Sequence, residues 1–288
     1  MHRITIAVVA ACAAALAAVS LSAAAYQPTR AQHRFPHRII SLSPTVTEDL
    51  FAIGAGKQVV AVDNQSNYPK RAPRTSLSGY TPNVEAIAGY HPDLVLISYD
   101  PGGLATQLRN LGIKVVFEAA ANNLKQAYGE ILGLGRLTGH TRGAKAVVHS
   151  MRTNLAAIVR SVPTTRRHLR VYHELDQNYY SVTSNTFVGS IYKLFGFRNI
   201  ADGASGAGGG YPQLSGEYII AKDPQIIVLA DTKCCQQSYA TVSARPGWST
   251  ITAVRHHRVV MANDDVASRW GPRIVQFART VARIAKQD

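Results

Sequence analysis

The stretch GHTRGAKAVVHSMRTNLAAIVRSV, from Gly139 to Val162, decides the fold of this chain. Its apolar residues recur at steps of three and four, which predicts one long α-helix with an apolar stripe on one face. Pro163 ends the predicted helix, because proline cannot continue the hydrogen-bond ladder. A helix of about 22 residues would be roughly 33 Å long, which is enough to join two lobes. The stripe consists of Ala144, Val147, Val148, Met151, Leu155, Ile158, Val159 and Val162, and Arg142, Lys145, His149, Arg152 and Asn154 fall on the other faces.

The sequence on either side of this helix contains two copies of one pattern. In each copy a glutamate opens a short helical segment, a proline follows seven residues later and a strand of buried type comes next. The first copy runs from Glu85 to Pro92 and the second from Glu217 to Pro224. A helix followed by a strand is half of a βαβ unit, so we predict an α/β fold with two Rossmann-like lobes of mostly parallel sheets, joined by the long helix. The alternative is that any α/β protein repeats such units.

The chain divides into five predicted segments around this helix. We expect an N-terminal lobe at residues 38–138, in which four strands alternate with four helices, and a C-terminal lobe at residues 163–288. The linker helix covers residues 139–162, and the first 37 residues comprise an export signal at 1–25 and a leader or tether at 26–37.

The N-terminus has the pattern of an export signal. A short basic start is followed by an uncharged, alanine-rich run from Ile4 to Leu21 and by small residues that end at Ala25. This pattern predicts a cleaved signal peptide, and therefore a protein of the periplasm or the outer face of the cytoplasmic membrane. Two alternatives stay open: lipidation at Cys12, which would anchor the protein, and an uncleaved anchor, since the run is near the length of a membrane span.

Composition and charge bound the function. The 288 residues, 46% of them hydrophobic, are enough for one large or two medium domains with buried cores. The formal net charge of +14 favours anionic ligands or acidic surfaces, although the basic residues are dispersed along the chain. Basic and aromatic residues do not interleave as a nucleic-acid surface requires, so we expect no nucleic-acid partner.

Two adjacent cysteines, Cys234 and Cys235, remain after cleavage of the signal. Exported proteins meet an oxidising environment, but ordinary disulfide geometry does not suit neighbouring residues. A strained vicinal disulfide, two free thiols, and a metal-binding or redox role all stay open. The pair follows a predicted strand, which would place it near the mouth between the lobes.

Motifs of catalysis are absent from the sequence. The ten histidines do not show metal-ligand spacing, and there is no G-x-S-x-G elbow. We therefore expect a binding protein rather than an enzyme, with no resident metal and no cofactor of its own. The alternatives from other classes are a two-lobed extracytoplasmic enzyme, which would need polar residues of perturbed pKa in its cleft, and a ligand sensor without a transporter.

Residues 38–288 resemble a known family, the helical-linker substrate-binding proteins of bacterial ABC importers for cobalamin, haem or ferric siderophores. The resemblance implies two α/β lobes on one stiff helix that move little on binding. It further implies a monomer that carries a metal chelate to an ABC permease dimer, with metal present only as part of the ligand. The motifs that carry it are RIISLSPTVTEDLFAIGAG, SNYP, PNVEAIAGYHPDLVLI, LSGEYIIAKDPQIIVLA, ARPGWSTITAVRHHRVV and DDVASRWGPRIV.

The resemblance also implies roles for single residues. Glu85 and Glu217 match the glutamates that meet permease arginines in the family, although both also fit charge compensation in a first helical turn, after Asn83 and Ser215. Asp265 and Arg269 match an acid and a base that face the ligand in cobalamin-binding members, and siderophore-binding members also use an arginine. Aromatic residues suit large flat ligands, although ordinary packing is the alternative for each tyrosine. The predicted ligand-binding residues are Ser43, Pro44, Tyr68, Tyr80, Tyr99, Tyr179, Tyr180, Tyr211, Asp265, Arg269 and Trp270.

Overall fold

The computed structural model describes residues 35–287. The predicted export signal at 1–25, Cys12 and most of the predicted leader at 26–37 lie outside these residues. Within the described part of the chain, no helix is long and apolar enough to cross a membrane.

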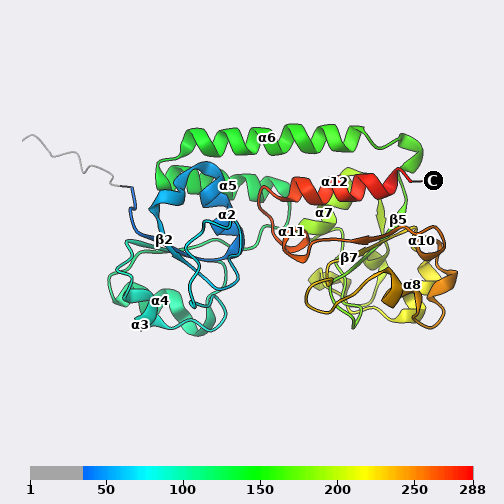
Figure 1. Cartoon of the computed structure of the whole chain (residues 1–288), viewed down its shortest axis with the longest axis horizontal. Coiled ribbons are helices and arrows are strands. Elements are labelled where there is room, and N and C mark those ends of the chain that lie inside the picture. The colour runs from blue at the N-terminus through cyan, green and yellow to red at the C-terminus, as the bar shows by residue number, and fades with distance from the viewer. Residues whose placement is uncertain (1–34, 288) are drawn as a thin grey trace, which may run out of the picture. The chain divides into compact units, whose positions relative to one another are not determined.

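Two four-stranded sheets form the framework, one before and one after the long helix α6 (Thr141–Arg160) (Figure 1). The strand orders are β2-β1-β3-β4 and β6-β5-β7-β8, so the second sheet repeats the first. All six strand pairs are parallel, as the repeated helix and strand pattern predicts. The strands are β1 (Ile39–Leu42), β2 (Val59–Val62), β3 (Leu94–Ile97), β4 (Val115–Phe117), β5 (Arg170–Glu174), β6 (Arg198–Asn199), β7 (Ile226–Leu229) and β8 (Val259–Met261).

Helices alternate with these strands in both lobes. The N-terminal lobe contains α2 (Pro44–Ile53), α3 (Val84–Ala88), α4 (Leu104–Asn110) and α5 (Leu124–Thr138). The C-terminal part contains α7 (Phe187–Leu194), α8 (Gly216–Lys222), α9 (Tyr239–Ser243), α10 (Thr252–Arg255), α11 (Asp264–Ser268) and α12 (Ile274–Ala285). Short 3-10 turns lie at Ala55–Gln58, Pro101–Gly103, Thr164–Arg166, Ile200–Gly203, Ala207–Gly209 and Trp248–Thr250.

Side-chain caps fix the starts of the two repeated helices. The amide of Ala86 donates to the Asn83 side chain (2.7 Å) at the start of α3, and the amide of Tyr218 donates to Ser215 Oγ (3.1 Å) at the start of α8. Each cap satisfies a backbone N–H that has no partner inside the helix. The caps explain why helices as short as α3 and α8 form at matching places before β3 and β7.

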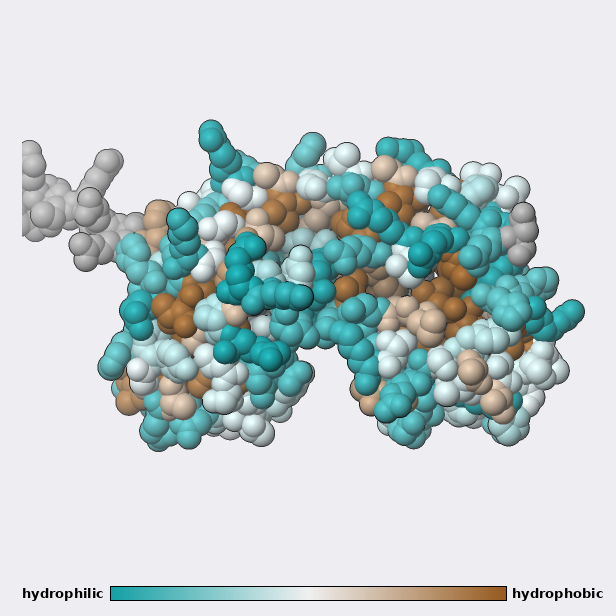
Figure 2. Space-filling view, in the orientation of Figure 1, coloured by the Kyte–Doolittle hydropathy of each residue, from teal (hydrophilic) through white to brown (hydrophobic). Residues whose placement is uncertain are grey.

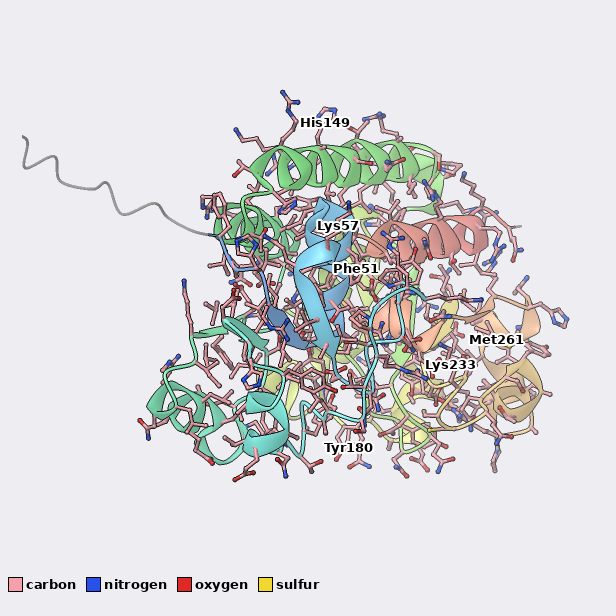
Figure 3. The ribbon with its side chains drawn as sticks, turned by 60° about the vertical axis from the view of Figure 1, so that its left-hand side comes forward. Phe51, Lys57, His149, Tyr180, Lys233 and Met261 are labelled. Atoms are coloured by element: carbon pink, nitrogen blue, oxygen red, sulfur yellow. The ribbon has the colours of Figure 1, made fainter. Side chains whose placement is uncertain are left out.

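Helix α6 lies along one side of both sheets (Figure 1). Ala144, Val148, Met151 and Leu155 of the predicted stripe are buried. His149 points to the outer side of the helix, as Figure 3 shows. The structure confirms the predicted helix, but α6 is two residues shorter at each end than the predicted range 139–162. The boundaries of the lobes themselves stay a prediction.

One apolar core runs beneath α6 through both lobes. Neighbouring strand residues point to opposite faces of a sheet, so Ile39 and Val171 belong to this shared core whereas Ile40 and Tyr172 pack into separate cores on the far faces. Helix α12 contributes Phe277 to the shared core. The lobes are therefore joined by packed side chains as well as by the chain itself.

Candidate functional site

A cavity of about 340 Å³ lies between the lobes, at the carboxyl ends of β1 and β3. Ligands of parallel α/β sheets bind at such ends. Ser43 follows β1 and Ser98 follows β3, and the Ser98 hydroxyl donates to Ser43 Oγ (2.8 Å). In Figure 2 the surface between the two lobes is notched on the side away from α6. Seven of the eleven predicted ligand residues line the cavity: Ser43, Pro44, Tyr80, Tyr99, Asp265, Arg269 and Trp270.

Two tyrosines form an exposed aromatic wall on the N-terminal lobe. Tyr80 is 71% exposed and Tyr99 is 57% exposed. Their ring centroids are 6.2 Å apart and the rings are tilted by 47°. These two adjacent rings offer an apolar surface that a bound molecule can cover.

Trp270 reaches from the segment between α11 and α12 to the N-terminal lobe. Its Nε1 donates to Glu130 Oε2 on α5 (2.8 Å), and its half-buried ring lines the cavity. Burial raises the pKa of Glu130 to about 7 against the opposing effect of this hydrogen bond, and Glu118 raises it further. The carboxyl that positions Trp270 therefore titrates near neutral pH.

Arg269 ties the C-terminal segment to the N-terminal lobe. Its guanidinium donates to Glu48 Oε1 (2.7 Å), Asn67 Oδ1 (3.0 Å), the Gln65 backbone oxygen (3.0 Å) and Asp265 Oδ1 (3.1 Å). The side chain is 9% exposed. A guanidinium has five N–H donors, so a ligand meets a cation whose donors are mostly in use.

Asp265 extends this network to Lys233. It accepts hydrogen bonds from Lys233 Nζ and from Asn67 Nδ2 (3.1 Å) as well as from Arg269. Burial alone would raise the pKa of Asp265, but Lys233, Arg269 and Asn67 together hold it below its usual value. Asp265 is therefore a carboxylate acceptor at neutral pH.

Glu48 and Arg273 belong to this network, and the sequence analysis missed both. Glu48 is 3% exposed and accepts from Arg273 Nε (2.8 Å) and Nη2 (2.5 Å) in addition to Arg269. A glutamate inside the apolar helix TVTEDLFAIG is the signal that could have found them, because a buried carboxylate needs a cationic partner.

The other four predicted ligand residues lie outside this cavity. Tyr68 lines a second cavity beside α6, where the Arg273 guanidinium packs over its ring at 4.3 Å. Tyr179 stacks on Trp248, with centroids 5.7 Å apart, in a third cavity that includes Glu217. Tyr180 and Tyr211 are surface residues, 41% and 57% exposed, and Figure 3 shows Tyr180 on the side away from α6.

Cys234 and Cys235 are free thiols in the structure, so of the three interpretations the vicinal disulfide is not formed. The pair follows β7, and Asp264 holds the loop by accepting from the amides of Thr232 (3.1 Å) and Lys233 (2.8 Å). Burial, followed by the effect of Cys235, raises the pKa of the Cys234 thiol to about 12. The thiol therefore stays protonated and is a poor nucleophile. Among residues 35–287, no group of three or more histidine, cysteine or acidic side chains could hold a metal ion.

Glu85 and Glu217 occupy matching positions on the two lobes. Each is exposed and lies in the first turn of its helix, α3 or α8. Figure 1 shows both helices at the ends of the lobes away from α6. The backbone N–H of Glu217 and the Ser215 hydroxyl hold the pKa of Glu217 below its usual value. Two fixed carboxylates on one side of the molecule could meet two cations of a partner.

Two parallel α/β lobes, one long connecting helix and an aromatic cavity between the lobes define the class of two-lobed solute-binding proteins. Within it, this chain belongs to the periplasmic binding protein family, whose model matches residues 39–266.

Three known proteins show the breadth of the likeness. A cobalamin-binding protein of Halobacterium salinarum is 34% identical over 251 residues, which is 84% of this chain and 67% of that protein. The uncharacterized ABC transporter substrate-binding lipoprotein YvrC of Bacillus subtilis is 30% identical over 262 residues, 88% of this chain and 81% of its own. The crystal structure of a possible iron-binding periplasmic solute-binding protein from Staphylococcus epidermidis superimposes with a TM-score of 0.76 at 27% identity, over 87% of this chain and 99% of that one.

Proposed function

We propose that this chain is the extracytoplasmic solute-binding protein of an ABC importer, and that cobalamin is the metal chelate that it carries. The observation that carries the proposal is the exposed pair Tyr80 and Tyr99, which lines a cavity between the lobes together with Trp270. The names of the Halobacterium and Bacillus relatives support a cobalamin ligand and an ABC transporter. The protein would act as an exported monomer and make or break no bond.

The charges around the cavity favour cobalamin over a ferric siderophore or haem. Asp63, Asp265 and Arg269 are the charged residues that line it, so the lining carries more negative than positive charge. Arg269 already balances Glu48 and Asp265. An anionic siderophore or the propionates of haem would meet the carboxylates of Asp63 and Asp265, whereas the amide side chains of a corrinoid can donate to them.

Delivery to the permease would use Glu85 and Glu217. Their exposure and their matching positions in α3 and α8 support this role. Ion pairs of this kind on two lobes would fix the orientation of the docked protein more than they would strengthen its binding.

Isothermal titration calorimetry tests the ligand. We expect cyanocobalamin to bind saturably in a 1:1 complex, and Tyr80→Ala/Tyr99→Ala to weaken the affinity by about tenfold to a hundredfold, because two aromatic contacts are lost. Tyr211→Ala is the matched control, since Tyr211 is as exposed as Tyr99 but lies outside the cavity.

Two outcomes would count against the proposal. Saturable binding of haemin or a ferric hydroxamate in place of cyanocobalamin would reassign the ligand. An absence of saturable heat with all three compounds would remove the chelate function itself.

A further inference from the structure

A second cavity, of about 560 Å³, is lined in part by Glu48 and Arg273, which form an ion pair. It is bounded by α2, α6, α12 and residues 68–71, and we call it the helix groove. Figure 3 shows Phe51 of α2 beneath α6. The larger apolar side chains that line the helix groove are Phe51, Val147, Met151 and Val275.

Three arginines also line the helix groove. Arg71 packs over the Phe51 ring at 5.2 Å, Arg273 packs over Tyr68 at 4.3 Å, and Arg279 Nη2 donates to Asn154 Oδ1 (3.4 Å). Aromatic rings and an amide contact these guanidinium groups without neutralising the charge of Arg71 or Arg279, whereas Arg273 is paired with Glu48.

Positive charge in the helix groove is not balanced by its lining. Glu48 is the acidic residue that lines it, and this carboxylate is buried and already shared by Arg269 and Arg273. Among residues 35–287, no carboxylate forms an ion pair with Arg71 or Arg279. Arg71 and Arg279 are therefore two exposed guanidinium groups without a carboxylate partner in the described part of the chain, beside a hollow that is lined by both apolar and polar side chains.

We propose that the helix groove binds a small amphipathic organic anion, with its carboxylate, sulfonate or phosphate on Arg71 or Arg279 and its apolar body on Phe51 and Met151. The volume of the groove lies in the range of small-molecule sites. Guanidinium groups bind such anions through charge-assisted hydrogen bonds. This site is distinct from the interlobe cavity. The helix groove favours an anion, whereas the lining of the interlobe cavity is acidic.

Calorimetry with octanoate and with 1-octanol tests the charge requirement. Octanoate binds saturably at one site, and the uncharged alcohol binds at least about tenfold more weakly. Arg71→Gln/Arg279→Gln weakens octanoate binding by about tenfold. The control Arg142→Gln/Arg283→Gln removes the same charge from exposed positions of α6 and α12 outside the groove, and leaves the affinity unchanged.

A second pair of variants tests the place without changing the charge. Ala146 is exposed on α6 and lines the helix groove, so Ala146→Trp fills the groove and abolishes octanoate binding. Ala156→Trp, at an exposed position of α6 outside the groove, leaves octanoate binding unchanged.

The proposal is overturned if octanoate gives no saturable heat. It is also overturned if Arg71→Gln/Arg279→Gln and the control Arg142→Gln/Arg283→Gln change the affinity for octanoate equally. It is equally overturned if Ala146→Trp binds octanoate like the wild type. Vesicles of phosphatidylglycerol that capture the protein through Arg71 and Arg279, without competition from octanoate, would assign the groove to a membrane surface instead.

Discussion

At the scale of single residues, the acids at the carboxyl ends of β5 and β7 differ in their hydrogen-bond partners. The Glu174 carboxylate accepts two hydrogen bonds from the Arg245 guanidinium (2.7 and 2.6 Å) and one from the Tyr172 hydroxyl (3.0 Å). Asp231 is fully buried nearby, and within residues 35–287 neither of its oxygens has a hydrogen-bond partner. Burial, followed by the charge of Glu174, raises the pKa of Asp231 to about 7. Asp231 is therefore stable as a neutral acid and costly as an anion.

This raised pKa makes stability fall as the pH rises from about 4 to about 7. In that window the folded chain keeps a proton on Asp231 that the unfolded chain has lost, so folding is favoured at the acidic end. Asp231→Asn removes the ionisation, and the amide can donate to Glu174 as the protonated acid can. We expect this variant to exceed the wild type in free energy of unfolding by about 1–3 kcal/mol at pH 8, and to show no gain at pH 4. Urea unfolding at the two pH values measures the difference.

Asp223 offers a control of opposite sign. Burial would raise the pKa of Asp223, but Thr252 and Arg170 outweigh it and hold the pKa below its usual value. Asp223→Asn should therefore lose stability at pH 8 and lose less at acidic pH. If Asp231→Asn were also less stable than the wild type at pH 8, the assignment of a neutral Asp231 would be wrong.

Residue chemistry was predictable from the sequence where it belonged to a motif and not where it depended on burial. The placement of Asp265, Arg269 and Trp270 beside the cavity followed from one short segment. The partnership of Arg269 with Glu48 joins residues 221 positions apart, and no local pattern shows it. Tyr68 was expected in the interlobe cavity, yet Arg273 holds it in the helix groove.

At the scale of elements, the packing of α6 depends on glycines at its crossings. A Cβ on Gly143 would lie 2.0 Å from the backbone oxygen of Ile53 on α2, and a Cβ on Gly135 of α5 would lie 2.4 Å from Ala144 Cβ. These contacts let the backbones of α2, α5 and α6 approach closely. The apolar period predicted α6, but a period of apolar residues says nothing about which glycine faces a neighbouring backbone.

Two glycine variants separate packing from helix propensity. Alanine favours a helix over glycine by about 1 kcal/mol, yet Gly143→Ala should destabilise the protein by about 1–3 kcal/mol, because the backbone of α2 must move. Gly129→Ala in α5 meets no atom within 4 Å, so it should stabilise by up to about 1 kcal/mol. Chemical denaturation of both variants checks the signs. Equal effects would show that the Gly143 approach is not tight.

At the scale of the whole molecule, the lobes are connected in three ways. Helix α6 joins them covalently, the apolar core beneath it is continuous, and Arg269 binds Glu48 and the Gln65 backbone across the gap. A separation of the lobes would break these contacts and expose part of the shared apolar core, so it is unfavourable. We therefore expect the positions of α3 and α8 relative to each other to change little when a ligand binds.

A constant spacing of Glu85 and Glu217 makes docking a property of the whole molecule rather than of either lobe. Glu85→Lys/Glu217→Lys should lower ligand uptake through the permease by at least about tenfold, because two attractions become repulsions. The Kd for cyanocobalamin should not change, since neither residue lines the interlobe cavity. Thr153→Lys/Ala157→Lys adds positive charge to exposed positions of α6, on the opposite side, and should leave uptake intact. Full uptake by the glutamate variant, or an equal loss in the α6 control, would contradict docking through α3 and α8.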